Sequence, residues 1–347
     1  MNETEKNAIL AAVREALTGD VSADMVYLQD QVEKYNEDDA TKDVADEIVK
    51  IAYGLLTPEQ NEYVQKTLYL GGKTLDRVYA EGEDALRAGQ TAKAIDILKP
   101  LYEHILANFD ETDALRFFSF RNLLESNLYH LLYHPTKKLM KTPYDFTLFI
   151  GAYAYALVEV RRLDEAIPVL KEAIRFNPVN PDVRFELAEI YKLTHDTDHL
   201  LETICDTLPI ASSAYAIARC YANLGYWAVD LKDYKSGIAF YYESLLFADD
   251  PRVPAEIQHI SMMMREPIVP PNRDMINAAF AKYNIFHGPG RELIHTANEL
   301  AKQAQEGQRW EEAVYYLTVI NSLTNDAEAK SALEKCIKEA NQLHPQE

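Results

Sequence analysis

Hydrophobic residues recur three and four positions apart along most of this chain, and that spacing predicts helices. Near the N-terminus three segments show such an apolar stripe among polar and acidic positions, at residues 4–17, 22–36 and 40–56. Thr57 and Pro58 then supply an N-cap and a first-turn proline, and Gln60 completes a capping box, so another helix begins there. We expect residues 1–72 to form a small helical bundle that caps the rest of the chain.

From Thr147 onward the pattern becomes a repeated unit of two helices, about 34 residues long. With Thr147 as position one, small residues fall at position 8 (Ala154), 20 (Ala166) and 27 (Ala173), an apolar residue at 24 (Leu170) and a proline at 32 (Pro178). Tyr221 to Ala228 repeat the first-helix signature, with Leu-Gly at its centre. Comparable units are predicted at residues 75–108, 147–180, 181–214, 218–251 and 294–327, the third being degenerate.

Four segments depart from this repeat. Residues 113–133 carry many aromatic and leucine positions and are predicted to form one long helix, and residues 135–143 form a basic loop bounded by prolines. Prolines also punctuate residues 251–271, which we expect to be less regular. The last helix is predicted at 326–343, apolar on one side only, as a solenoid needs to close its exposed end.

The repeated units resemble tetratricopeptide repeats, over about half of the chain. The resemblance implies an all-α fold, a right-handed α-α superhelix (solenoid) of helical hairpins over residues 73–347, because repeats this small bury their apolar faces only by stacking. It also implies a non-catalytic scaffold or adaptor that binds a protein or peptide, without identifying the partner.

In this family ligands usually lie along the concave face, lined by fixed positions of each first helix. Carried over, these positions are Leu148, Gly151, Tyr155, Val158 and Glu159, then Asp182, Phe185, Glu189, Lys192 and Leu193, then Arg219, Ala222, Tyr226, Val229 and Asp230. The expected peptide site is a mixed aromatic and acidic groove of Tyr155, Glu159, Phe185, Glu189, Arg219, Tyr226 and Asp230. The alternative is that its tyrosines pack against the next repeat.

Some family members hold a terminal carboxylate with lysines and asparagines at set places in three successive repeats. Here Gly151, Tyr155 and Glu189 stand where basic or amide groups are wanted. That clamp is therefore absent, and recognition of an acidic C-terminal tail is not expected. A basic or aromatic partner suits this groove better.

Net charge and cysteines narrow the class further. The formal charge of −20 argues against nucleic acid, which needs clustered Lys and Arg. The most apolar run, residues 146–158, is too short to span a bilayer, and the N-terminus lacks the features of a secretory signal. Three widely spaced cysteines fit a reducing compartment, so we expect a cytoplasmic protein that binds no membrane.

Candidate chemical sites are few. His195 and His199 stand four residues apart, as do His130 and His134, but neither pair has an identifiable third ligand, so no metal is expected. Residues 287–292 precede a helix without the pattern of a phosphate loop, and no known catalytic motif is present. We therefore expect no enzyme activity and no cofactor.

Two rival functions remain open. A helical N-terminal bundle followed by such repeats is also the layout of peptide-controlled bacterial regulators, including phosphatases. Regulators of that kind that bind DNA carry a basic N-terminal helix-turn-helix, which the 15 acidic and 6 basic side chains of residues 1–70 exclude. The other rival is an enzyme with its site near the loop at 135–143.

Overall fold

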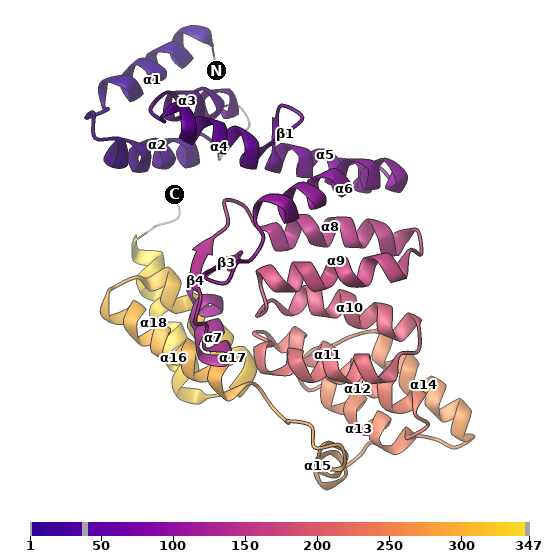
Figure 1. The fold of residues 1–347 in the computed structure, drawn as a ribbon. Coiled ribbons are helices and arrows are strands. Elements are labelled where there is room, and N and C mark those ends of the chain that lie inside the picture. The colour runs from indigo at the N-terminus through magenta and orange to yellow at the C-terminus, as the bar shows by residue number, and fades with distance from the viewer. Residues whose placement is uncertain (1, 37–40, 344–347) are drawn as a thin grey trace. The chain divides into compact units, whose positions relative to one another are not determined.

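The computed structural model describes residues 2–36 and 41–343 and divides them into two compact units, residues 1–77 and 78–347. Helices dominate both units, and within the described residues the only strands form two small two-stranded sheets. The predicted all-α, solenoid-like fold is thereby confirmed (Figure 1). The boundary falls in the first turn of helix α5 (Leu75–Arg87). That the first unit caps the solenoid stays a prediction.

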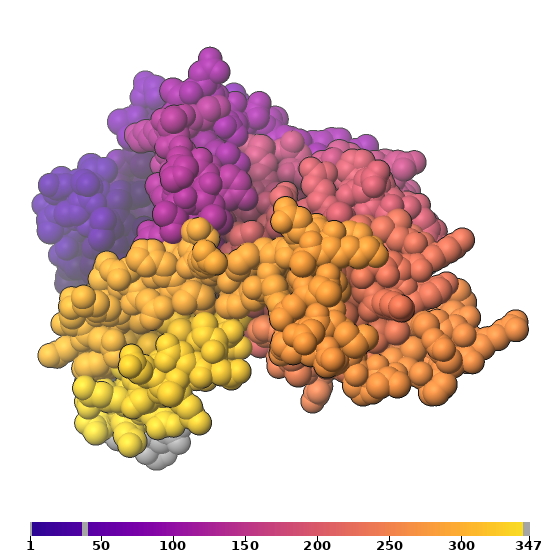
Figure 2. Space-filling model, turned by 90° about the horizontal axis from the view of Figure 1, so that it is seen from below, coloured from indigo at the N-terminus to yellow at the C-terminus, as the bar shows by residue number. Residues whose placement is uncertain are grey.

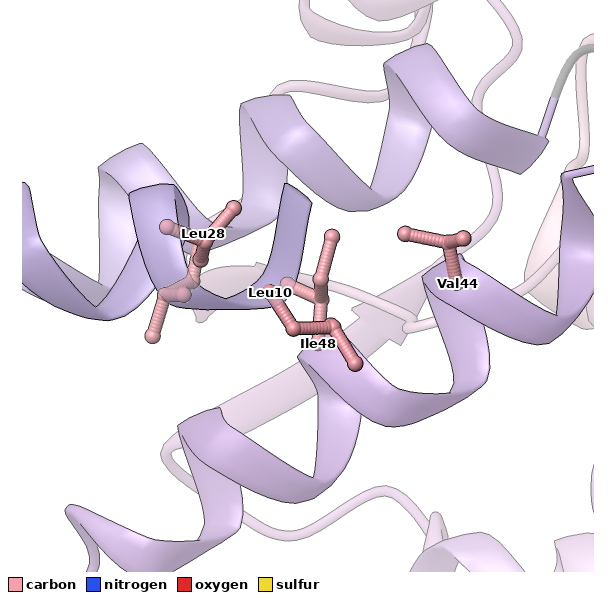
Figure 3. Packing of buried hydrophobic residues seen from close by; sticks show 5 residues of the cluster. Leu10, Leu28, Val44 and Ile48 are labelled. Atoms are coloured by element: carbon pink, nitrogen blue, oxygen red, sulfur yellow. The ribbon is translucent and has the colours of Figure 1, made fainter. Parts of the chain in front are cut away.

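The first unit is a bundle whose helices lie close to the predicted ranges: α1 (Glu3–Glu15), α2 (Val21–Asn36), α3 (Lys42–Gly54) and α4 (Pro58–Leu68). The predicted helix at 40–56 begins at Lys42, and Ala40 lies outside the described residues. Leu10, Leu28, Val44 and Ile48 are almost fully buried and point toward one another between α1, α2 and α3 (Figure 3). Burial of these apolar side chains is the main force that holds the bundle together.

A capping box and a tight turn bound α4. The Thr57 hydroxyl accepts the Gln60 N–H at 3.2 Å, and the Gln60 side chain accepts the Thr57 N–H at 2.9 Å, as the sequence predicts. After α4, β1 (Tyr69–Leu70) pairs antiparallel with β2 (Lys73–Thr74). Gly71 and Gly72 both adopt positive φ between them, which is the backbone that a two-residue hairpin requires.

The second unit contains five helical hairpins, each at a predicted repeat: α5 with α6 (Thr91–Asn108), α8 (Phe146–Glu159) with α9 (Leu163–Phe176), α10 (Pro181–Leu193) with α11 (Thr197–Thr207), α12 (Ala214–Asp230) with α13 (Tyr234–Ser244), and α16 (Arg291–Glu306) with α17 (Trp310–Thr324). From α8 to α13 each helix packs on the next, and the first helices also touch in succession, α8 with α10 and α10 with α12. Figure 1 shows the hairpins from α8 to α13 as one stack, whereas α16 and α17 lie beside α7.

Small residues make this close packing possible. Ala154 of α8 and Ala166 and Ala173 of α9 have no exposed surface, as the predicted repeat register requires. Gly225 of α12 lies against the ring of Tyr241 on α13, where a Cβ atom would come within 2.7 Å. Side chains larger than these would force the paired helices apart.

The long helix predicted at 113–133 is wrong in its first half. Residues Leu115–Phe118 form strand β3, and helix α7 spans only Leu123–Tyr133. The loop predicted at 135–143 contains strand β4 (Lys138–Lys141), which pairs with β3 in parallel. The cause is non-local, because β3 finds its hydrogen-bond partner beyond α7. Asn122, whose side chain accepts the Glu125 N–H at 3.0 Å, starts the helix late.

Beyond the fourth hairpin the chain is less regular, as predicted, and then turns back. This part contains α14 (Arg252–Met264), α15 (Arg273–Lys282) and α18 (Ala327–Leu343), while the short helix η1 (Leu208–Ile210) lies earlier, between α11 and α12. Helix α16 packs against α7, far back in the sequence, and Asn122 Nδ2 donates to the Tyr315 hydroxyl at 3.0 Å. Figure 2 shows the yellow and orange C-terminal helices beside the magenta segment that contains α7.

Candidate functional site

The first helices of three successive hairpins, α8, α10 and α12, share one face of the second unit, which we call the first-helix face. The opposite sides of these helices are buried against the second helices. The side chains on the first-helix face are therefore not buried by that packing. Leu148 and Tyr155 of α8 are 53% and 48% exposed although both are large and apolar. Two pockets lie along the first-helix face, one over α8 and α10 and one over α10 and α12.

The first, which we call the acidic pocket, has a volume of about 280 Å³. Its floor is apolar, from Leu148, Ala152, Tyr155 and Leu170, and four carboxylates surround it against the single cation of Arg121: Glu83, Asp145, Asp182 and Glu186. Arg121 is already held by Glu125 at 2.6 Å and Asp182 at 3.2 Å. The pocket therefore keeps an excess of negative charge around an apolar surface.

Partial desolvation acts on two of these carboxylates: Asp145 is half-buried, whereas the Glu186 side chain remains 50% exposed. Burial raises the pKa of Asp145, although the Leu148 N–H and the charge of Arg121 oppose the shift. Burial also raises the pKa of Glu186, and the neighbouring carboxylate of Glu189 adds to the effect while Arg219 opposes it. A cation entering the pocket would relieve both penalties, because an opposite charge favours the ionised form of a carboxylic acid.

The second, which we call the arginine pocket, has a volume of about 80 Å³. It is lined by residues of α10 and α12, and by Tyr241 and the region around α14: Glu189, Lys192, Arg219, Ala222, Asn223, Tyr226, Asp250, Arg252, Val253 and Glu256. Three cations and three carboxylates balance there. Lys192 bonds to Glu189 at 2.9 Å, and Arg252 bonds to Asp250 at 2.7 Å, so most of these charges are paired.

Arg219 links the two pockets. Its guanidinium lies over the Phe185 ring at 4.4 Å, and its Nη2 atom is 3.9 Å from Glu186 Oε1 and 3.7 Å from Glu189 Oε1. Stacking on an aromatic ring fixes the plane of a guanidinium while leaving its N–H groups free. The acidic and arginine pockets are thus neighbours along one strip.

Four of the seven residues predicted for the groove line one of the two pockets, and three of them share the arginine pocket. Tyr155 lines the acidic pocket, and Glu189, Arg219 and Tyr226 line the arginine pocket. Tyr226 also donates its hydroxyl hydrogen to the Lys192 carbonyl at 3.1 Å, which joins α12 to α10 as the alternative packing role anticipates.

The other three predicted residues line neither of these pockets. Phe185 is only 3% exposed, so its ring supports Arg219 from below and is not itself a contact surface. Glu159 acts on its neighbour, because its negative charge raises the pKa of Tyr155. Asp230 is 3.2 Å from His195 Nδ1, at the far end of α12.

Sequence reasoning missed several residues that line the pockets. Glu186 stands one helical turn before Glu189, so an i, i+3 spacing on α10 could have revealed it. Arg121 precedes α7, and Arg252 begins α14, so neither falls within a regular repeat. Asn223 was also not predicted, because it lies between Ala222 and Tyr226, two of the family's groove positions.

The paired histidines do not form a single helical site. His195 has a positive φ of 53° after the end of α10, and His199 belongs to α11, so their spacing is not that of one helix. His199 Nδ1 is 2.8 Å from Asp196, and His134 ends α7 in the left-handed conformation. Over the described ranges, no group of three or more His, Cys, Asp or Glu side chains is placed to hold a metal ion.

Two other segments singled out by the sequence have structural partners. In the basic segment, Lys137 pairs with Glu111 at 2.8 Å beside β4. The loop before α16, predicted to join two hairpins, is anchored there: His287 Nε2 is 2.8 Å from Glu243, and the Gly288 N–H donates to the Tyr221 hydroxyl at 2.7 Å. The Gly288 amide therefore already donates a hydrogen bond within the protein.

Comparisons with known proteins do not identify a family for this chain. No family model matches the chain, and no curated relative matches it. One solved structure, described as a "putative protein binding protein" from Bacteroides ovatus ATCC 8483, is similar at 15% identity and a TM-score of 0.23, covering 78% of this chain and 100% of that one. Among the residues described here, no helix is both long and apolar enough to cross a membrane.

Proposed function

We propose that this chain is a protein- or peptide-binding scaffold of the tetratricopeptide type, and that the first-helix face holds an extended peptide carrying Lys or Arg. The observation that carries the proposal is the acidic pocket. Four carboxylates surround its apolar floor, and its lining contains one cationic side chain to balance them. An aliphatic stem with a cationic head suits such a surface, because the stem covers the floor while the head meets the carboxylates.

The family assignment rests on the hairpins. Five of them occur at the predicted positions, and the alanines at the predicted crossing points of the 147–180 unit are fully buried. Such solenoids present extended surfaces to partners. A cytoplasmic location is part of the proposal and is supported by three free thiols, at Cys205, Cys220 and Cys336.

The test is selection from a random peptide library on the immobilised full-length protein, followed by binding kinetics at two salt concentrations. Selected peptides should be rich in Lys or Arg and tolerate aromatic residues. Their on-rate should fall with salt, because exposed charges are screened beyond about 8 Å at physiological ionic strength. Tyr226→Ala should act mainly on the off-rate, since it removes contact area.

A matched pair of variants locates the site. Glu186→Gln removes one carboxylate of the acidic pocket and should slow association, whereas Asp198→Asn removes an exposed charge of α11 and should not. Selection of peptides that lack basic residues would contradict the proposal. So would equal effects of the two variants, which would move the binding surface away from the first-helix face.

A further inference from the structure

The segment that joins α14 to α15 is rich in proline, and we call residues 266–272 the proline segment. Two of its prolines, Pro267 and Pro270, stand three residues apart, and Pro271 follows. A proline ring fixes φ at about −65°, and the residue before a proline is driven into the extended region. One or both rules apply to every position from Glu266 to Pro271 except Ile268. The sequence of this segment therefore favours the left-handed polyproline II helix.

The backbone of the proline segment is fixed at both ends and unpaired between them. At its start, Arg265 ends α14 with a positive φ of 59°, and the Ser261 hydroxyl donates to the Glu266 carbonyl at 2.7 Å. At its end, Asn272 has an extended backbone, with φ −79° and ψ 171°, and caps α15. Over the part of the chain that the structure describes, residues 267–271 form no backbone hydrogen bond. Polyproline II has no internal hydrogen bonds, so an unpaired backbone agrees with that conformation.

Exposure along the proline segment repeats every three residues, which is the period of polyproline II. Ile268 and Pro271 are half-buried, and Ile268 packs against the buried cluster of Ile238, Tyr241, Val253 and Ile260. The other five residues are exposed, and Val269 is 77% exposed: Glu266, Pro267, Val269, Pro270 and Asn272. One edge of this three-sided helix is therefore anchored on the protein, and the other two edges face outward.

The two outward edges carry the apolar groups that a polyproline-binding groove contacts. Pro267 and Pro270 share one edge, and Val269 stands on the next. Pro-x-x-Pro segments dock into aromatic-lined grooves of SH3 and WW domains, which exploit the preformed polyproline II helix. Such a groove would remove from water apolar surface that this fold leaves exposed.

We propose that the proline segment is a docking site for a partner protein with an aromatic-lined polyproline-binding groove, of the kind found in SH3 and WW domains. Anchoring through Ile268 and both helix ends holds the segment in the bound conformation beforehand, which reduces the entropy lost on binding. Within residues 41–343, the linings of the acidic and arginine pockets include none of residues 266–272. The inference is therefore independent of the proposed function. At the first-helix face the chain receives a peptide, whereas here the chain itself is the ligand.

The test uses the full-length protein and a panel of purified, immobilised SH3 and WW domains. At least one domain should bind the protein, and a synthetic peptide of residues 264–273 should compete for the same groove. Absence of binding to every domain of the panel would overturn the inference. Binding that the peptide does not displace would also overturn it, as would a domain that binds the peptide and not the folded protein.

Substitutions on the two outward edges locate the contact. Pro267→Ala and Pro270→Ala should each weaken binding about tenfold, because the two methylene groups lost from each ring contribute roughly that factor when buried. Val269→Ala loses two methyl groups and should have a similar effect. Pro254→Ala is the matched control, since Pro254 is an exposed proline in the first turn of α14. All four variants should melt at the wild-type temperature, and an equal loss of affinity in the control would overturn the inference.

Ile268 tests whether the fold presents the segment. Its side chain lies on the anchored edge, away from the groove, so Ile268→Ala in the free peptide should leave the affinity unchanged. The same change in the folded protein should weaken binding, because the segment loses its anchor. Equal losses in peptide and protein would place Ile268 in the groove, and no loss in either would show that the anchor has no role. Each of these results contradicts the assignment of edges or of pre-organisation.

Discussion

At the scale of single residues, the space around small side chains sets the distance between helices. Ala166 has no exposed surface and lies in α9 against α8. We predict that Ala166→Leu costs about 1–3 kcal/mol in unfolding free energy, because the added methyl groups have no space. Lys171→Leu, an exposed position of the same helix, is the control and should change little. Urea denaturation measures both, and an unchanged midpoint for Ala166→Leu would mean that the assigned register is wrong.

Substitution of two helical glycines should change the melting temperature in opposite directions. A Cβ atom at Gly225 would come within 2.8 Å of several atoms of the buried Tyr241 ring, whereas one at Gly151 would meet nothing within 4 Å. Gly225→Ala should therefore lower the melting temperature. Gly151→Ala should raise it, since alanine in a helix is favoured by about 0.5–1 kcal/mol over glycine. If both variants shifted in the same direction, steric contact with Tyr241 would not be the reason for Gly225.

At the scale of elements, Asp233 ties the α12–α13 hairpin to the end of α15. Its carboxylate accepts from Lys282 Nζ at 2.7 Å and from the Tyr283 hydroxyl at 2.6 Å. Burial alone would raise the pKa of Asp233, but hydrogen bonds from Lys282, Ser236 and Tyr283 outweigh burial and lower it to about 2. Since the unfolded value is near 3.8, the ionised group stabilises the fold fully above about pH 4.

That contribution should fade as the pH drops from about 4 through 2. We predict that the unfolding free energy of the wild type falls more steeply over this range than that of Asp233→Asn, because the variant has no carboxylate to protonate. Urea titrations at pH 7, 4 and 3 measure the difference. Parallel curves for the two proteins would show that the contact between α13 and α15 does not depend on this charge.

The elements that could be read from the sequence are those specified locally. Helix α9 follows from its own hydrophobic period, α8 from an apolar run at repeat positions, and α4 from its capping box. Strand β3 could not be read in this way, because its aromatic residues suit a helix or a strand equally and its partner β4 lies beyond α7. Pairing with a distant segment leaves no period in either sequence.

The pocket residues likewise fall into those that the sequence predicts and those that it does not. Tyr155, Glu189, Arg219 and Tyr226, which line the two pockets, are repeat positions that the sequence predicts for the groove. Arg121 and Arg252 reach the pockets from segments outside the regular repeats, so no spacing rule points to them. Phe185 is buried and carries Arg219 over its ring, a contact that only the three-dimensional packing reveals.

At the scale of the whole molecule, the buried cores of the two units are apolar and helical, and we predict that stability is independent of metal ions. EDTA should leave the melting temperature unchanged within error, in the presence or absence of added Zn²⁺. A decrease of several degrees with EDTA would contradict this, and His195→Ala with His199→Ala would then show whether those histidines are responsible.

Helix α7 can be covered by α16 only after most of the chain has been synthesised. Asn122, at its start, bonds to a residue 193 positions further along the chain, and α16 packs on the same helix. A ribosome adding roughly 5–20 residues per second needs roughly 10–40 s to make that distance. During this interval the hairpins from α8 to α13 can stack on one another as they emerge, while α7 still presents apolar surface to chaperones. Premature termination before α16 would leave that surface exposed for good, so truncated products should be retained by chaperones and degraded.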